Sequence, residues 1–489
     1  MGRFSRNILI ALFVLGIALR VRQYSAFTSY WYDEAYLLLN IFHKSFIGLL
    51  GPLRDDQAAP PLFLWLLRGL YRLVGGAEGW MRLPALAASV AGLLVMAPLA
   101  RRIAGRHSWL WSVAFCALGH HAAAHAGEVK PYAFDFLMTE AILLATLSCQ
   151  HFDRNLWPKI VLSLLAVLAP WVSYPAIFVL GAASMALMVH AFRHRCSAHA
   201  RSRFTLACAA GCLSILSSFI LWQLVIRHQA TSALRTYWAS SFLDLSSAGA
   251  AAASIGRSLI EIGNYGTREM GLPLVALSLV GAASLRHRPA RLVLLVGPFV
   301  LAFLASALCL YPLGGRLLFF LVPCLWLLAA RGIDVLSQRL PHRLAWVGWI
   351  LPAALLFPAA LSAERLFSGV TPRCQFREAF AYVEAHRDSG DVLWVSHPQV
   401  YEVYQGRAPD LCAYSPPEMV EQVARTRRLW MVCAVAGSRE RYTAAETVLR
   451  VKAASPIILD RRRFRGLEVV LYGPSTEKGS LLSSVKGEQ

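Results

Sequence analysis

Residues 204–226 read FTLACAAGCLSILSSFILWQLVI and contain no charged side chain. At about 1.5 Å of rise per residue, a helix over this stretch can cross the ~30 Å hydrocarbon core of a bilayer. Hydrophobic and small side chains occupy every face of such a helix, so no face of it is suited to water. The stretch therefore predicts a transmembrane helix.

Ten further apolar segments lie on both sides of this one. They cover residues 7–23, 82–100, 108–126, 132–150, 159–171, 175–192, 271–285, 292–310, 317–330 and 344–361. Hydrophobic residues make up 57% of the chain and charged residues 16%, whereas soluble proteins carry about 25% charged residues. This composition excludes soluble, disordered, collagen-like and coiled-coil chains. The sequence predicts a polytopic α-helical membrane protein with about 11 transmembrane helices.

The net charge of +20 is concentrated between the apolar segments. The first 361 residues carry 30 Lys/Arg and 13 Asp/Glu, whereas residues 362–489 carry 18 and 15. Basic residues that separate membrane spans orient the protein and give no indication of a nucleic-acid partner.

Among the short loops between segments, alternate ones hold nearly all of the basic residues. They contain Arg101, Arg102, Arg154, Lys159, Arg193, Arg195, Arg201, Arg203, Arg286, Arg288, Arg291, Arg331, Arg339 and Arg343, whereas the other short loops contain only Lys130 and Arg316. The positive-inside rule places the basic loops and the N-terminus in the cytoplasm. Since the first segment lacks a signal-peptide cleavage site, we expect it to remain as a span. We therefore expect a multi-pass protein of the inner (cytoplasmic) membrane, with its tail outside the cytoplasm.

Two domains follow from this layout. Residues 1–361 form the membrane domain, including an extracytoplasmic loop over residues 24–81, and residues 362–489 form a small extracytoplasmic α/β domain. In the loop, apolar residues on one helical face predict a helix lying along the membrane surface: Leu62, Phe63, Leu66, Leu70 and Leu73. In the tail, a helical pattern and three strand patterns predict the α/β fold: Phe376–His386, Val392–Val395, Leu429–Val435 and Glu468–Tyr472.

The first candidate site is the acidic pair Asp33-Glu34, which lies among aromatic residues just beyond the first span. Adjacent carboxylates can accept a proton from a hydroxyl nucleophile or hold a divalent cation against phosphate oxygens. A solvated acidic pair in an aromatic belt at the membrane interface explains the same residues equally well.

The second and third candidates lie in short outward loops. Glu128, Lys130 and Tyr132 precede the fourth span, where a carboxylate and an amine suit sugar hydroxyls and phosphate; a surface ion pair is the simpler interpretation. Arg316 precedes the tenth span, where its guanidinium suits a phosphodiester or extends to lipid headgroups. Three nearby histidines have no matching ligand set, so we expect no metal site there: His120, His121 and His125.

The order of these motifs resembles the GT-C superfamily of membrane glycosyltransferases. The motifs are Asp33-Glu34-Ala35, Ala59-Pro60-Pro61-Leu62, Arg82-Leu83-Pro84-Ala85, Glu128-x-Lys130-x-Tyr132 and Gly315-Arg316-Leu317-Leu318. Within the superfamily the chain is most similar to the RgtA/B/C/D-type branch, which is related to protein O-mannosyltransferases and lipid A aminoarabinose transferases. The resemblance covers roughly residues 7–361.

The resemblance implies an enzyme that transfers a hexose or pentose from a polyprenyl-phosphate donor to an extracytoplasmic glycan, lipid or protein, with inversion. By the same resemblance Asp33 would be the general base and Glu34 would orient the site. Glu128, Lys130 and Tyr132 would bind sugar and phosphate, and Arg316 would hold the lipid phosphate. No separate metal site is expected; a divalent cation such as Mg²⁺ or Mn²⁺, if used, would lie at Asp33 and Glu34.

Two positions depart from the family pattern, and two other function classes compete. Ala59 stands where the family commonly has His, and Lys130 replaces an Arg. A transporter or flippase of lipid-linked glycans is the main alternative, although no inverted repeat is evident. A non-catalytic scaffold would leave the acidic pair unexplained. Consumption of the donor lipid in proteoliposomes separates the three classes.

Overall fold

The computed structural model describes residues 2–26, 28–105, 108–151, 155–196, 200–339, 341, 346–368, 373–434, 441–454 and 457–474. Arg154 and Arg343 of the predicted basic loops lie outside these ranges. The chain divides into two compact units, each described here by itself. Unit 1 comprises residues 1–26 and 44–370, and unit 2 comprises residues 27–43 and 371–489.

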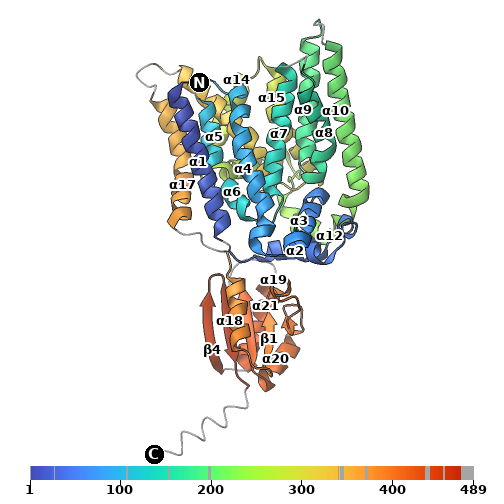
Figure 1. The fold of residues 1–489 in the computed structure, drawn as a ribbon, viewed down its shortest axis with the longest axis vertical. Coiled ribbons are helices and arrows are strands. Elements are labelled where there is room, and N and C mark those ends of the chain that lie inside the picture. Colours follow the sequence, from blue (N-terminus) through green and yellow to red (C-terminus); the bar gives the residue numbers. More distant parts are fainter. Residues whose placement is uncertain are drawn as a thin grey trace, which may run out of the picture. The chain divides into compact units, whose positions relative to one another are not determined.

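Unit 1 is almost entirely helical, and its long helices run side by side (Figure 1). In chain order its longer helices are α1 (Arg3–Ser25), α3 (Pro61–Val74), α4 (Glu78–Ile103), α5 (Trp109–Leu118), α7 (Tyr132–His151), α8 (Trp157–Val172), α9 (Ala176–Arg193), α10 (Ala200–Leu221), α13 (Ala248–Thr267), α14 (Gly271–Ser284), α15 (Pro289–Ala307), α16 (Val322–Arg339) and α17 (Val347–Ser368). Shorter helical segments are η1 (Gly48–Leu50), η2 (Arg54–Asp56), α6 (His120–Ala124), η3 (His125–Gly127), η4 (Trp222–Ile226), α11 (Arg227–Gln229), α12 (Ser232–Tyr237), η5 (Ala239–Ser241) and η6 (Gly315–Leu321).

Every apolar segment predicted from the sequence contains helix within the described residues. Among the described residues, 7 helices are long and apolar enough to cross a membrane. Four shorter apolar helices match the remaining segments: Trp109–Leu118, Trp157–Val172, Gly271–Ser284 and Trp349–Leu361. The chain is therefore a polytopic helical membrane protein, as its composition predicted.

The expectation of one continuous helix over residues 108–126 is wrong. Helix α5 ends at Leu118, and Gly119 leaves helical geometry with ψ at 118° before α6 and η3 begin. Glycine in a helix interior costs about 1 kcal/mol relative to alanine, which makes this the weakest point of the segment. The break matters because the residues after it, from His120 to Gly127, lead directly into the Glu128 loop.

The central element of unit 1 is the η6–α16 segment, whose apolar part is 89% buried. Helix α14 packs directly against α16. A Cβ added at Gly281 would lie 1.9 Å from the Leu328 carbonyl oxygen, and one at Gly332 would lie 2.1 Å from the Leu277 carbonyl oxygen. Only glycine allows the two backbones to approach this closely, a common arrangement between membrane helices.

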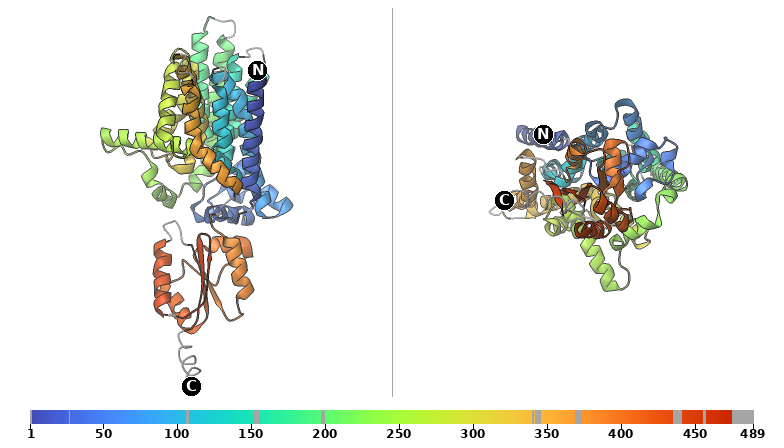
Figure 2. Two further views of the ribbon diagram at one scale, coloured as in Figure 1. Left: turned by 90° about the vertical axis from the view of Figure 1, so that its left-hand side faces the viewer. Right: turned by 90° about the horizontal axis from the view of Figure 1, so that it is seen from below.

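The loop helix α3 forms where the sequence predicted it, but its buried face is shifted. It buries Phe63, Leu64 and Leu67, whereas Leu66 and Leu73 are exposed. The exposed apolar residues suit a helix that lies at a membrane surface. The sequence pattern did not predict α13, which lies in the light green segment to one side of the long helices (Figure 2).

Unit 2 contains a five-stranded sheet with the order β2-β1-β3-β5-β4. Its strands are β1 (Val392–Val395), β2 (Leu411–Cys412), β3 (Leu429–Ala434), β4 (Ile458–Phe464) and β5 (Leu467–Tyr472). Strands β2, β1 and β3 are parallel, and β5 pairs antiparallel with both β3 and β4. The predicted small α/β domain is confirmed, because the predicted helix and strands are present within the described residues.

Side chains alternate across this sheet to build two cores. On one face, Leu393 and Trp430 pack with residues of α18 (Phe376–His386) and α19 (Pro398–Gln405). On the other face, Trp394 and Met431 pack with residues of α20 (Pro417–Thr426) and α21 (Arg441–Ala454). The domain is thus a three-layer α/β/α structure.

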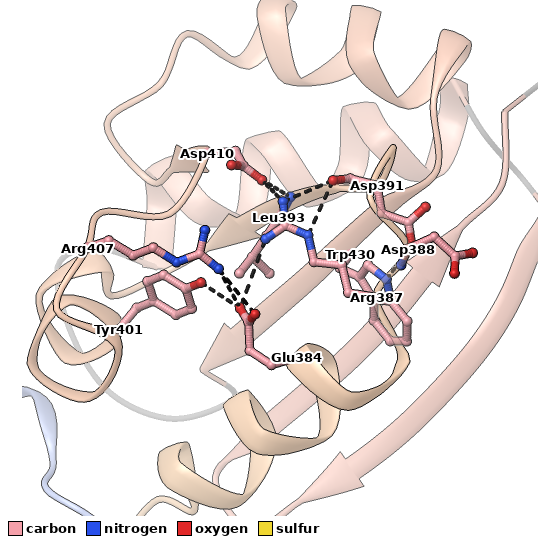
Figure 3. A network of polar contacts seen from close by, with 9 residues as sticks. All are labelled: Glu384, Arg387, Asp388, Asp391, Leu393, Tyr401, Arg407, Asp410 and Trp430. Carbon is pink, nitrogen blue, oxygen red and sulfur yellow. Dashed lines mark hydrogen bonds and ion pairs between the residues drawn. The ribbon is translucent and has the colours of Figure 1, made fainter.

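Polar contacts in unit 2 join the loop before β1 to β3 and join α18 to α19 and the residues after it (Figure 3). The Trp430 indole donates to the Asp391 carboxylate at 2.9 Å. The Tyr401 hydroxyl donates to Glu384 Oε1 at 2.6 Å, and Arg407 donates to the same carboxylate at 3.1 Å. Burial and the hydrogen bond to Glu384 raise the pKa of Tyr401 to about 12. The Tyr401 hydroxyl therefore keeps its proton, and its hydrogen bond to Glu384, throughout the physiological pH range.

The boundaries of the two units differ from the expected division at residue 361. Helix α17 continues past this point to Ser368. Residues 27–43, which contain α2 (Tyr32–His43), group with the C-terminal sheet rather than with the membrane helices. Ala35 packs in the same core as Phe376 and Leu393, a contact between residues too distant in sequence for pattern reasoning to anticipate.

Candidate active site

The acidic pair lies in the first turn of α2, and both of its side chains are buried. The backbone N–H groups of Glu34 and Ala35 each donate to the Trp31 carbonyl at 3.0 Å, which starts the helix. Glu34 Oε2 accepts the Trp31 backbone N–H at 3.3 Å. This is the reciprocal contact that a glutamate three residues into a helix makes with the residue that caps it. Glu34 therefore has a structural role in α2.

Several contacts within unit 2 fix the segment around Asp33. The Tyr32 ring stacks on the His397 imidazole with centroids 5.1 Å apart, and the Arg373 guanidinium lies 4.0 Å from the Trp31 ring centroid. The Tyr30 backbone N–H donates to the Tyr404 hydroxyl at 2.6 Å. The C-terminal domain thus holds the acidic helix through the residues that immediately precede Asp33.

The two carboxylates do not form a shared cation site by themselves. Asp33 and Glu34 are consecutive residues of a helix, and consecutive side chains point about 100° apart. Glu34 is also engaged with the backbone of Trp31. No group of three or more His, Cys, Asp or Glu side chains among the described residues could hold a metal ion.

In unit 1, Glu128 is part of a buried hydrogen-bonded chain. Glu128 Oε2 lies 2.8 Å from His125 Nδ1, and His125 Nε2 lies 2.7 Å from the Tyr265 hydroxyl. The His121 ring stacks on Tyr265 with centroids 3.7 Å apart and an interplanar angle of 8°. His125 thus makes hydrogen bonds with its ring nitrogens, and His121 makes an aromatic contact.

Lys130 is buried, and the first outer loop supplies its partner. Its Nζ donates to Gln57 Oε1 at 2.9 Å. Two residues further on, the Ala59 backbone N–H donates to Gln229 Oε1 at 3.1 Å, and the Tyr174 hydroxyl lies 2.8 Å from the Ala59 carbonyl oxygen. At the position where the family that the chain resembles commonly has His, the backbone of Ala59 makes these two contacts.

Arg316 lies beside Tyr132, although the two residues belong to distant motifs. The Arg316 guanidinium carbon lies 5.6 Å from the centroid of the Tyr132 ring, within the range of a cation–π contact. The preceding Gly315 has a φ of +51°, which favours glycine, and its N–H donates to Glu261 Oε1 at 2.5 Å. The structure thus joins the Glu128–Tyr132 loop to the Gly315-Arg316 turn.

Three of the four unit 1 residues predicted from the sequence are connected by contacts, because His125 contacts both Glu128 and Tyr132, and Tyr132 contacts Arg316. The fourth, Lys130, is in the same loop and contacts Gln57. Lys130 and Arg316 supply positive charge and Glu128 supplies a carboxylate, a combination that can bind a phosphate and an adjacent sugar hydroxyl. Sequence reasoning missed four contributors: Gln57, His125, Glu261 and Tyr265. The spacing of His125 and Glu128 was visible in the sequence, whereas nothing there linked Tyr265 or Glu261 to these loops.

Comparisons with solved structures identify the fold. The crystal structure of ArnT from Cupriavidus metallidurans bound to undecaprenyl phosphate matches with a TM-score of 0.53 and 13% identity, covering 94% of this chain and 97% of that one. The oligosaccharyltransferase of Archaeoglobus fulgidus, tethered to an acceptor peptide, matches with a TM-score of 0.55 and 11% identity, covering 93% and 72%. The same archaeal enzyme, AglB, in complex with an inhibitory peptide and a dolichol-phosphate gives a TM-score of 0.50 at 10% identity.

These matches define the class of fold. The neighbours are GT-C glycosyltransferases, so the chain has the GT-C fold that its motif order resembled. No protein-family model and no curated protein sequence matches the chain. At 13% identity or less, the likeness shows the fold alone.

Proposed function

We propose that the protein is a membrane glycosyltransferase that uses a polyprenyl-phosphate-linked sugar as its donor. The observation that carries this proposal is the contact between Arg316 and Tyr132, which joins the Gly315-Arg316 turn to the Glu128-x-Lys130-x-Tyr132 loop. Arg316 contacts Tyr132, which lies two residues after Lys130, and two cations brought together in this way suit the phosphate of a lipid donor. The neighbours bound to undecaprenyl phosphate or a dolichol-phosphate support the same donor class.

The proposed reaction is a single displacement at the anomeric carbon. The Asp33 carboxylate removes the proton of an acceptor hydroxyl, whose oxygen forms a bond to the anomeric carbon. The bond between that carbon and the phosphate oxygen breaks, and polyprenyl phosphate leaves with inversion of configuration. Lys130 and Arg316 stabilise the negative charge that develops on the leaving phosphate. The Glu128 carboxylate accepts a hydrogen bond from a hydroxyl group of the transferred sugar. Glu34 keeps α2 in place.

A transporter or flippase of lipid-linked glycans is the second candidate. Asp135 and Glu140 are buried within α7, and ionisable groups inside membrane helices often mark a transport path. Both functions require binding of the same phosphate lipid, but only the transferase releases free polyprenyl phosphate. Measuring that release therefore separates them.

Arg316→Ala tests the phosphate role. We expect it to weaken binding of undecaprenyl phosphate by roughly 1–3 kcal/mol, the scale of a charge-assisted contact. Microscale thermophoresis of purified protein in detergent measures this directly. Arg235→Ala is the matched control, because Arg235 is exposed on α12 and should leave the affinity unchanged. If Arg316→Ala binds undecaprenyl phosphate with unchanged affinity, Arg316 does not hold the donor phosphate and only contacts the headgroups of the bilayer lipids.

The proposed orientation has the basic loops in the cytoplasm and the C-terminal domain outside. Cys196 is exposed in the loop after α9, and Met419 is exposed on α20. With Cys196 as the only native cysteine kept, we expect a membrane-impermeant maleimide to leave it unlabelled in intact cells. In a cysteine-free chain, Met419→Cys should react. Labelling of position 196 but not of position 419 would show that the orientation is the opposite of the proposed one.

A further inference from the structure

One face of α13 contacts both motifs of the candidate phosphate site in unit 1. Glu261 and Tyr265 lie four residues apart on this helix, so their side chains share a face. Glu261 accepts the Gly315 N–H at 2.5 Å, directly before Arg316. The Tyr265 hydroxyl lies 2.7 Å from His125 Nε2, which leads to Glu128. A single turn of helix therefore bridges the second outer loop and the Arg316 turn.

The contact through Tyr265 is tightly constrained. A carboxylate at Nδ1 and a hydroxyl at Nε2 engage both nitrogens of the His125 ring, which fixes the ring's orientation. His125 is only 3% exposed. The Tyr265 ring is stacked against His121 at 3.7 Å and lies 5.8 Å from the Phe319 ring of η6. The phenol therefore cannot shift without displacing rings on three elements.

The contact through Glu261 acts on the backbone that carries Arg316. Gly315 is the first residue of η6 and has a left-handed φ, so its N–H points away from the helix that follows. The Glu261 carboxylate accepts this N–H and thereby sets the direction in which the chain enters Arg316. Replacing the carboxylate with a group that cannot accept a hydrogen bond frees the turn.

We propose that Glu261 and Tyr265 are positioning residues, and that α13 braces the Glu128 loop and the Arg316 turn so that both act on one phosphate. This inference rests on the proposed donor-binding role of Lys130 and Arg316. Two cations bind a phosphate together only while their separation is held, and here they come from loops far apart in the sequence. Helix α13 holds that separation, although it contributes no positive charge to the phosphate contact itself.

The test measures binding of undecaprenyl phosphate to the purified full chain. Glu261→Ala and Tyr265→Phe should each weaken binding by roughly 5- to 20-fold, as loss of a supporting hydrogen bond does. Glu261→Gln keeps an acceptor oxygen and should retain most of the affinity. The matched controls are Glu269→Ala and Tyr237→Phe, whose side chains are exposed in the same region. Both controls should bind like wild type.

A double substitution separates positioning from a general loss of stability. In the Arg316→Ala background, Glu261→Ala should cost less than about twofold, because its effect acts through Arg316. Thermal unfolding of every variant is followed in parallel. An equal effect of Glu261→Ala with and without Arg316, or a lower melting temperature with unchanged affinity, would overturn the brace. Failure of the wild-type chain to bind undecaprenyl phosphate would instead overturn the proposed function, and the brace with it.

Discussion

Asp33→Asn should reduce turnover by about 10²-fold or more while leaving folding and binding of undecaprenyl phosphate intact. The amide has the shape of the carboxylate but cannot accept the proton of an acceptor hydroxyl. The buried position of Asp33 in the first turn of α2 means that a substitution of equal size is needed to keep the local packing. Single-turnover transfer by the purified variant measures the effect without interference from product release.

Glu34→Gln is the matched control for this substitution. Its amide oxygen can still accept the Trp31 N–H that Glu34 Oε2 accepts at 3.3 Å. We therefore expect Glu34→Gln to cost far less than Asp33→Asn. Near wild-type turnover in Asp33→Asn would make the assignment of the base wrong, whatever the behaviour of Glu34.

Arg20→Met should destabilise unit 1 by about 3–5 kcal/mol, the cost of removing one partner of a buried charged network. Arg20 is fully buried in α1, and its guanidinium donates to Ser89 Oγ of α4 at 2.9 Å and to the Cys116 carbonyl of α5 at 3.0 Å. The substitution leaves these buried acceptors without the guanidinium that joins α1 to α4 and α5.

Thermal unfolding in detergent micelles measures the loss. Arg22→Met is the control, since Arg22 lies on the same helix and is only partly buried. Arg20→Lys should rescue little, because an ammonium cannot reach several acceptors as the planar guanidinium does. If Arg20→Met unfolds at the same temperature as Arg22→Met, the network is not a major source of stability.

The membrane fold was largely predictable, because hydropathy reports directly on burial in a bilayer. The uncharged run over residues 204–226 lies within α10 and η4. The run over residues 108–126 also lacks Asp, Glu, Lys and Arg, yet it breaks at Gly119. Hydropathy indicates whether a segment can be surrounded by lipid or by other apolar helices. It does not indicate where a helix within that segment ends.

The site was predictable in its charged residues but not in their supports. Lys130 and Arg316 stood out because cations are rare in the outward short loops. Glu261 and Tyr265 lie in a helix rich in alanine and serine, whose pattern gave no sign of a neighbour. The grouping of α2 with the C-terminal sheet depends on contacts such as Tyr32 with His397, which only a folded chain brings together.

The most direct test of a lipid-linked glycosyltransferase is release of undecaprenyl phosphate in proteoliposomes. Wild-type and Asp33→Asn protein are each supplied with undecaprenyl-phosphate-linked pentoses and hexoses and with a glycolipid extract of the source membranes as acceptor. We expect the wild-type protein to consume one donor, release undecaprenyl phosphate and label an acceptor, and Asp33→Asn to do so at least about 10²-fold more slowly. Movement of the intact donor across the bilayer by the wild-type protein, with no release of undecaprenyl phosphate, would contradict the account.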